Sequence, residues 1–353
     1  MDLNISEYIP VKRLTKDDLM DIAKAHVELL VAEAECLYDT EALFHNINEI
    51  GLLEHTALLV NSTLSTEGLL SPIKTFFKQL MNCAYKLLNW INTILQKYQF
   101  KQRCLHICEK LKKIKEHVRR LKPSQESAPT ADQNENAAGV NILNIDENPY
   151  ADKTVDKVNV SLESVRIRAE RMGQILHDLR TMSQAAGRLL NINLKKKDLT
   201  IADMDAFIEK AKTEKEQIDQ LLKSAQKTAI ELNDAKLTPP KPSKESPDVI
   251  ATASDAIIKS IGFVFDEWSS IQDNIATISG KLGRLSTGTV DTYNVVNATS
   301  QNGKTKLSEL MEHIQPALAT MRAVRDTMPT SFATINAIVV VVDARYKEIV
   351  AKA

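Results

Sequence analysis

The sequence predicts an all-α protein built from long amphipathic helices, and three observations lead to that prediction. Apolar residues recur at the helical spacing of three and four in five stretches of the chain. Only 10 Gly and 11 Pro occur among 353 residues, too few turn-forming residues for an all-β fold. With 43% apolar and 26% charged residues, the composition is typical of a folded protein. We therefore expect elongated helices that form hairpins or a bundle, joined by proline-rich linkers.

Residues 1–67 form an acidic segment. They contain 13 acidic and four basic residues, which gives a net charge of −9. Helices are expected at about 15–39 and 40–60, the first with an apolar side that includes Ile22 and Leu29. The first ten residues are acidic and lack an apolar core, so no secretory signal is expected.

Residues 68–122 reverse this charge balance, with 13 basic residues against two acids, or +11. Ser71 and Pro72 favour a helix start in which Ser71 caps the helix and Pro72 takes its first position. The apolar spacing that follows slips near Lys101, which predicts a break. Its apolar face is expected to pack on a partner helix or to lie on a membrane, and it comprises Phe76, Phe77, Leu80, Leu87, Trp90, Ile91 and Ile94.

The densest positive charge lies at 110–122, where seven Lys or Arg residues and His117 stand against Glu116 alone. Such a helix face attracts phosphate without sequence preference, so non-specific DNA is one expected partner and an anionic membrane surface another. The residues expected to make these contacts are Lys110, Lys112, Lys113, Lys115, Arg119, Arg120 and Lys122. Packing against another helix is the favoured role of the segment, with the other two superimposed on it.

The rest of the chain divides into two helical regions and two linkers. Residues 123–156 are rich in Pro, Ser, Asn and Gln and are expected to be a flexible linker. Residues 157–236 are expected to form an antiparallel hairpin, whose second helix begins at a cap made by Thr200 and Asp203. Residues 237–248 form a proline-rich linker.

Residues 249–353 are expected to form a C-terminal bundle. Its first helix has the most regular apolar stripe of the chain, from Ile250 to Leu285, with Trp268 in register. Two further helices are expected, at 304–328 with a kink at Pro316, and at 330–351. Trp268 should be buried against these last two helices.

The sequence contains no recognised catalytic or metal-binding motif. Cys104 and Cys108 share a helix face from which His106 points away, and no second ligand pair accompanies them, so core packing is expected. There is no HExxH sequence, no phosphate-binding glycine loop and no GxSxG sequence. We expect no enzyme activity, no cofactor and no metal, and four reduced cysteines.

The short sequence Ser65-Thr66-Glu67-Gly68 coincides with the reversal of charge. A small residue two positions before a Glu also occurs elsewhere in the chain about as often as chance gives. An ordinary loop between helices is therefore an equal alternative to a processing site.

This layout resembles the internal head proteins of large tailed bacteriophages. In that family an acidic helical propeptide ends in a small residue–x–Glu motif, followed by Gly and a basic helix rich in Phe, Trp and Ile. The matching residues are Ser65, Thr66, Glu67 and Gly68 with the helix after them, and the resemblance covers about the first 120 residues.

The resemblance implies a non-enzymatic structural protein of the virion interior, made in the host cytoplasm. A prohead protease would cut after Glu67, which would change the formal charge from −1 to +8. Such a product favours packaged DNA or an anionic membrane surface. Other virion proteins, or further copies of the chain, are expected to pack on its helical stripes.

Two other classes fit parts of the sequence. Components of cytolysin-A-type α-helical pore-forming toxins share the long helices and an amphipathic segment, but no apolar tongue stands out between 157 and 353. A generic helical scaffold is the third interpretation.

Overall fold

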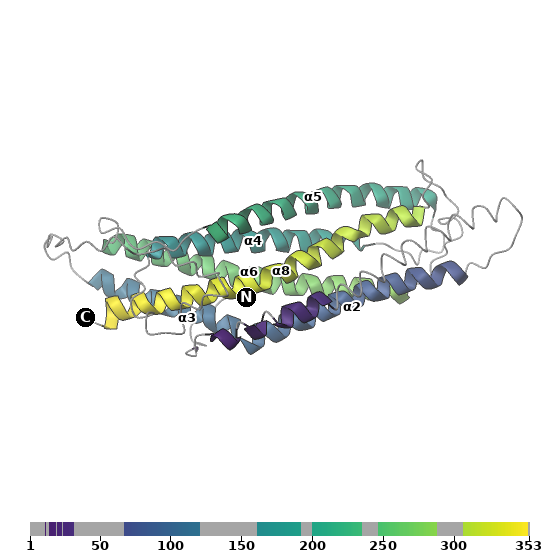
Figure 1. The fold of residues 1–353 in the computed structure, drawn as a ribbon. Coiled ribbons are helices and arrows are strands. Elements are labelled where there is room, and N and C mark those ends of the chain that lie inside the picture. Colours follow the sequence, from purple (N-terminus) through teal and green to yellow (C-terminus); the bar gives the residue numbers. More distant parts are fainter. Residues whose placement is uncertain are drawn as a thin grey trace, which may run out of the picture.

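The computed structural model describes residues 11, 14–18, 20–22, 24–31, 67–120, 161–191, 200–234, 246–287 and 306–351. All regular structure in these ranges is helical, which confirms the predicted all-α class (Figure 1). The expected helix at 40–60, the linker at 123–156, most of the linker at 237–248, and Ser65, Thr66 and Lys122 lie outside the described residues.

The helices form an elongated bundle of four rods with a fifth helix on its outside (Figure 1). The first rod is broken in two, α2 and α3, and the other three rods are α4, α6 and α8. The bounds are Glu67–Lys97 for α2, Phe100–Arg120 for α3, Leu162–Leu189 for α4, Pro247–Thr287 for α6 and Lys306–Tyr346 for α8. The outer helix, α5 (Ile201–Asp234), packs on α4 and α8, and a π-helix, η4 (Lys347–Ala351), extends α8.

Ion pairs fix the direction of α4 and α5. Arg188 near the end of α4 pairs with Glu214, with 2.7 Å between Nε and Oε1, whereas Arg171 reaches Glu231 further along α5. The two helices therefore run antiparallel and pack against each other.

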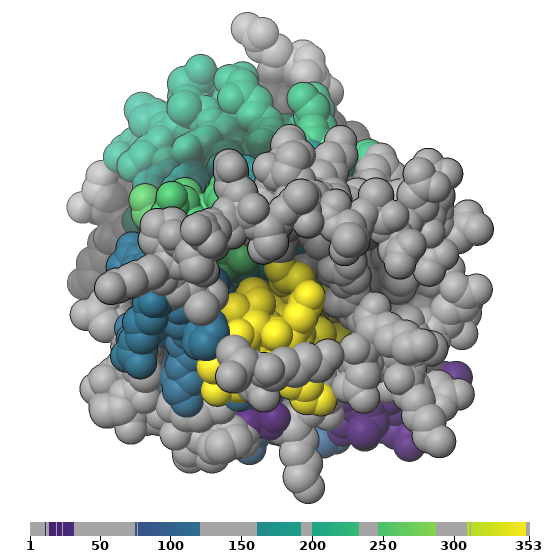
Figure 2. Space-filling view, turned by 90° about the vertical axis from the view of Figure 1, so that its left-hand side faces the viewer, coloured from purple at the N-terminus to yellow at the C-terminus, as the bar shows by residue number. Residues whose placement is uncertain are grey.

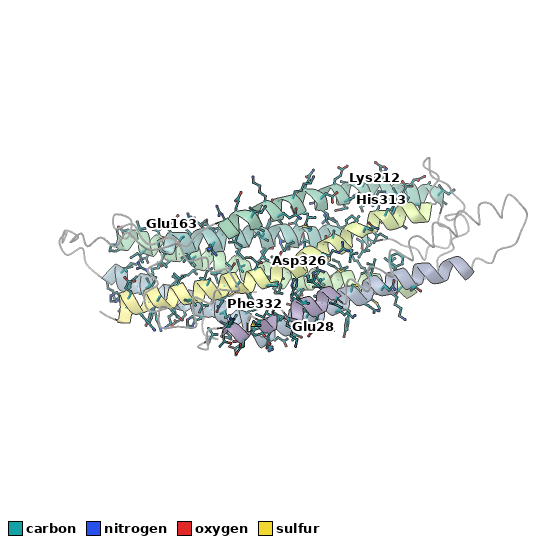
Figure 3. All side chains as sticks on the ribbon, viewed as in Figure 1. Glu28, Glu163, Lys212, His313, Asp326 and Phe332 are labelled. Atoms are coloured by element: carbon teal, nitrogen blue, oxygen red, sulfur yellow. The ribbon has the colours of Figure 1, made fainter. Side chains whose placement is uncertain are left out.

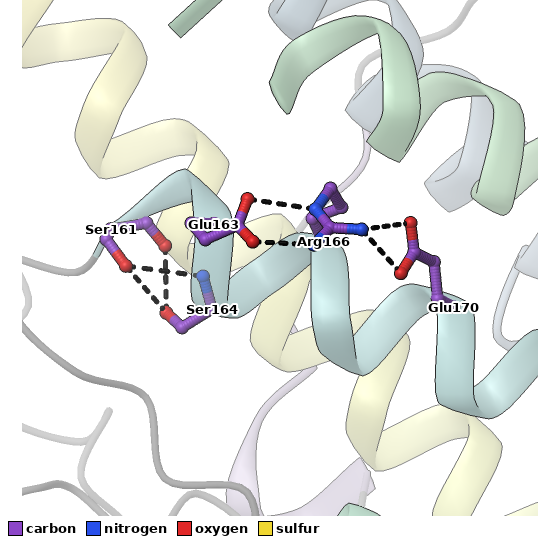
Figure 4. A network of polar contacts seen from close by, with 5 residues as sticks. All are labelled: Ser161, Glu163, Ser164, Arg166 and Glu170. Atoms are coloured by element: carbon purple, nitrogen blue, oxygen red, sulfur yellow. Dashed lines mark hydrogen bonds and ion pairs between the residues drawn. The ribbon is translucent and has the colours of Figure 1, made fainter. Parts of the chain in front are cut away.

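Side-chain caps set the starts of these two helices. At α4, Ser161 accepts a hydrogen bond from the Ser164 amide at 3.2 Å, and Arg166 bridges Glu163 and Glu170 (Figure 4). At α5, Thr200 and Asp203 exchange backbone-to-side-chain hydrogen bonds, as the sequence predicts.

The α6 stripe is buried as predicted. Every predicted position from Ile250 to Leu285 is at most 8% exposed, and Trp268 is 1% exposed. The helix covering Trp268 differs from the expectation, because α6 packs against α2, α3 and α4 and makes at most marginal backbone contact with α8. Residues 249–353 therefore do not form a bundle by themselves: α6 and α8 lie at opposite corners of a bundle that the whole chain builds.

Helix α8 is enclosed by α3, α4 and α5. Residues 337–342 are all buried, so no face of the helix meets solvent there. Seen from the end, the last turns of α8 lie centrally, with α3 beside them and the α4–α5 pair at the top (Figure 2). Further along, His313 of α8 lies on the side of α5, toward Lys212 (Figure 3), and burial together with Lys215 and Lys212 lowers the pKa of His313.

Two expected helix boundaries were wrong. The helices predicted at 304–328 and 330–351 are one continuous helix with Pro316 and Pro329 inside it, because burial of Met328 and Phe332 around Pro329 offsets the missing hydrogen bond. Helix α2 begins at Glu67 rather than at Ser71. A proline at position 72 removes only the bond to the carbonyl of residue 68, one turn from the helix start.

Candidate functional site

The apolar face of α2 is buried inside the bundle. Phe77, Leu80, Leu87, Ile91 and Ile94 are at most 4% exposed, and Trp90 is partly buried against the same core. The side chain of Phe76 lies outside the described residues. This face therefore packs on partner helices in this fold and is not open to a membrane.

The rod formed by α2 and α3 breaks at Tyr98 and Gln99, close to the slip predicted near Lys101. Gln99 adopts a φ of 52°, the left-handed conformation that a non-glycine residue rarely takes. Arg103 closes the break, because its Nε donates a 2.8 Å hydrogen bond to the Tyr98 carbonyl, which α2 leaves without a helical partner. Phe332 of α8 fills the inner side of the break, with its ring centroid 6.1 Å from that of Tyr98 and 5.0 Å from that of Phe100.

Helix α3 separates its apolar and basic residues cleanly. Cys104, Ile107, Leu111 and Ile114 are fully buried. The opposite face carries the predicted basic residues, of which Lys112, Lys113, Arg119 and Arg120 are exposed and Lys110 and Lys115 are half-buried.

Four of these bases have partners on α6, α8 or α3 itself. Lys115 bonds Asp255 of α6, and Arg119 lies 3.9 Å from the same carboxylate. Lys110 Nζ lies 3.8 Å from the centroid of the Tyr346 ring, and Lys113 pairs with Glu109 at 2.6 Å. Among the described residues no ion pair holds Lys112 or Arg120, so the outward charge of α3 is only partly neutralised.

The described part of the acidic segment lies across α2 and α8, and we call residues 14–31 the arm. The Leu14 amide donates to Asn336 Oδ1 at 3.2 Å, and Asp21 lies 3.3 Å from Lys97. His26 Nε2 lies 3.3 Å from Asp326 Oδ1 of α8.

The carboxyl of Asp326 is shifted by its surroundings. Burial alone would raise the pKa of Asp326, but the contacts from His26 and Arg325 outweigh it and hold the pKa below its usual value. The Asp326 carboxylate is therefore ionised at neutral pH, where it contacts His26 of the arm.

The Glu67–Gly68 junction is helical, since these are the first two residues of α2. A protease needs an extended chain, so cutting here requires the first turn of the helix to open. Helix ends fray readily, which makes this a small step.

The cysteines and histidine of α3 do not converge. Burial raises the pKa of the Cys108 thiol to about 12, and the pKa of Cys104 is also well above its usual value. His106 instead lies 2.6 Å from Asp343 of α8. Within the described ranges, no group of three His, Cys, Asp or Glu side chains is placed to hold a metal ion.

Sequence reasoning missed two features at the break. One is the buried guanidinium of Arg103. The sequence pattern does not reveal its burial, because Arg103 lies among the basic residues of an amphipathic helix. The other is a cleft of about 520 Å³ between the break and α6, lined by amide side chains such as Gln99 and Gln272 and by Trp268. The helix spacing locates the break, but it does not predict that α6 forms the other side of the cleft.

Comparison with family models, curated proteins and solved structures finds no match. Within the described part of the chain, one helix, spanning Glu312–Val350, is long and apolar enough to cross a membrane, and 67% of its most apolar window is buried in the bundle. A core helix passes the same test.

Proposed function

We propose that the protein is a non-enzymatic structural protein of the head interior of a large tailed bacteriophage, which contacts packaged DNA through the outward face of α3. The observation that carries this proposal is the division of α3 into a buried apolar face and an outward basic face. Exposed lysines and arginines on a rigid helix attract the phosphate backbone whatever its sequence.

The acidic segment supplies the second part of the proposal. Cleavage after Glu67 removes residues 1–67 and raises the formal charge of the chain to +8. The arm is docked partly by polar contacts near the surface, such as Asp21–Lys97, in which the side chains are 60% and 54% exposed. Such contacts contribute little stability, so the released arm can leave the bundle.

The DNA contact is tested with a fourfold variant of the full chain, Lys112→Gln, Lys113→Gln, Arg119→Gln and Arg120→Gln. Its matched control changes four exposed lysines of α5, Lys210, Lys215, Lys223 and Lys227, to Gln. Each phosphate contact contributes about 0.9 to the slope of log K against log salt, so the α3 variant should flatten that slope and the α5 control should not. Equal slopes in a fluorescence-anisotropy titration of duplex DNA would remove this role of α3.

Processing is tested on native particles by determining the N-terminal residue of the mature protein. Gly68 is the expected result. An intact acidic segment in mature particles would remove the processing step and leave the DNA contact standing.

A component of an α-helical pore-forming toxin is the second candidate, because the apolar stretch of α8 is long enough to span a membrane. That function requires the bundle to open, since residues 337–342 are buried. Leakage of dye from anionic liposomes would favour it over the phage role.

A further inference from the structure

The arm covers a strip of the bundle that is rich in cations. It runs antiparallel to α8, because Leu14 meets Asn336 whereas His26 meets Asp326. It also runs antiparallel to α2, because Asp21 meets Lys97 and the His26 ring lies 6.0 Å from that of Trp90. The arm therefore lies along the seam between α2 and α8.

The described part of the arm buries little apolar surface. Leu14 and Ile22 are at most 6% exposed, whereas Met20, Val27 and Val31 are each 54% exposed. Ala25 and Leu29 are only partly buried against the core, and the remaining described anchors are a few polar contacts, which is a weak attachment for a segment of this length.

The strip beneath the arm presents donors that have no acceptor in the described parts of the chain. Arg103 is 4% exposed and its Nη1 is unpartnered, while the indole Nε1 of Trp90 is buried without a partner. The charge of Asp18 on the arm acts on Arg103, whose pKa is lowered by burial. Two further cations adjoin them: Lys86 of α2 and Arg325 of α8, which bonds Asp326, meet Leu29 of the arm around a cavity of about 20 Å³.

We propose that the seam between α2 and α8, with Lys86, Trp90, Lys97, Arg103 and Arg325, is a second site for the DNA phosphate backbone, and that the arm occupies it until the acidic segment is removed. Asp18 and Asp21 are one helical turn apart, about 5–6 Å at Cβ, and stand where phosphates would lie. This inference rests on the proposed function and adds a site that the basic run of α3 does not include.

DNA fits this seam better than a membrane does. A membrane-binding surface needs apolar side chains to insert, but the apolar face of α2 is turned into the bundle. Beneath the arm the cations and donors lie beside Asp326, whose carboxylate already pairs with Arg325, and beside a few apolar side chains such as Leu87 and Met321. The excess of positive charge and of donors along this line suits a phosphodiester chain.

The test compares two variants of the full chain that carry the same charge change. Asp21→Lys breaks the contact with Lys97, whereas Asp17→Lys changes an exposed residue of the arm that has no partner in the described residues. At about 50 mM salt, Asp21→Lys should bind duplex DNA about five-fold more tightly than Asp17→Lys, the size expected for one surface ion pair. The double variant Asp21→Lys with Lys97→Glu restores a pair and should close the arm again, which the accessibility of Trp90 measures independently of the charge of Lys97.

Trp90 reports separately whether the arm has left. In a Trp268→Phe background, which leaves Trp90 as the only tryptophan, Asp21→Lys should increase quenching of its fluorescence by acrylamide, and the double variant should reverse that increase. A chain in which Trp90 becomes accessible but DNA affinity matches Asp17→Lys would overturn the site. Unchanged quenching together with a DNA affinity equal to that of Asp17→Lys would also overturn the proposal, and a gain on anionic vesicles alone would assign the seam to membranes.

The experiments distinguish failure of the seam as a DNA site from failure of the proposed role of α3. If the fourfold α3 variant binds DNA like the wild-type chain while Asp21→Lys gains affinity, the proposed role of α3 fails and the seam remains. If the Asp21→Lys and Asp17→Lys variants bind DNA equally while the α3 variant binds it more weakly, the seam fails as a site and the role of α3 remains.

Discussion

Helices α6 and α8 have the same length, 41 residues, yet their sequences are informative to very different degrees. Helix α6 has a single apolar stripe, and every position of that stripe is buried. Helix α8 is apolar all round between residues 337 and 342 and contains two prolines. An amphipathic pattern exists only where one face of a helix is exposed to solvent. Helix α8 is buried on all sides at 337–342, so it lacks there the signal that locates the other helices.

The largest effect is expected where α8 fills the break in the α2–α3 rod. Phe332→Ala should lower the free energy of unfolding by about 3–5 kcal/mol, because a fully buried ring is lost from between Tyr98 and Phe100. Trp268→Ala in α6 should cost a similar amount. Urea unfolding followed by circular dichroism measures both, and a loss below about 1 kcal/mol at either site would contradict the packing of that helix.

A second prediction tests whether α8 is buried on every side. Val339→Thr, Val340→Thr and Val341→Thr should each destabilise by about 1–3 kcal/mol, because each hydroxyl enters an apolar environment. In α6 the same kind of change should distinguish neighbours: Ile257→Thr should be costly, and Ile258→Thr, which is only partly buried, should cost less. If one of the three α8 substitutions left the free energy of unfolding unchanged, that side of α8 would be exposed to solvent.

Prolines provide a third comparison. Pro329→Ala restores a backbone hydrogen bond in the middle of α8 and should stabilise the protein by about 1 kcal/mol, since the tertiary fit around the proline limits the gain. Pro247→Ala at the first position of α6 should change stability by less than about 0.5 kcal/mol, because no helical bond is lost there. Destabilisation by Pro329→Ala would mean that α8 needs a bend at that point.

The smallest effect concerns Asp326, through which α8 holds the arm. Its pKa is depressed in the folded state, so its contribution is present above its unfolded pKa and is lost as the pH falls through the folded pKa. Quenching of Trp90 should therefore increase in acid, below about pH 4. In an Asp326→Asn variant the arm should be looser at neutral pH, and this acid transition should shrink.

Much of the candidate site could be predicted from the sequence. The division of α3 into apolar and basic faces, the break near Lys101 and the acidic N-terminal segment all follow from spacing and charge. The seam could not be predicted. The side-chain donors of Arg103 and Trp90 are buried and unpartnered because the arm and α8 cover them, and both of these elements are distant in sequence. The partners of α3 were also missed: Asp255 lies 140 residues from Lys115.

The sequence by itself determined the helical class, the core-facing side of α2 to α6 and the cap at Thr200, because these depend on residues within a few turns of one another. Tertiary structure decided that α8 is one helix through Pro329, that α6 and α8 occupy opposite corners, and that the arm lies over the α2–α8 seam. These outcomes depend on how surfaces from the whole chain fit together. The burial gained by that fit outweighs local preferences, including those of a proline or of the β-favouring run Ile338 to Val342.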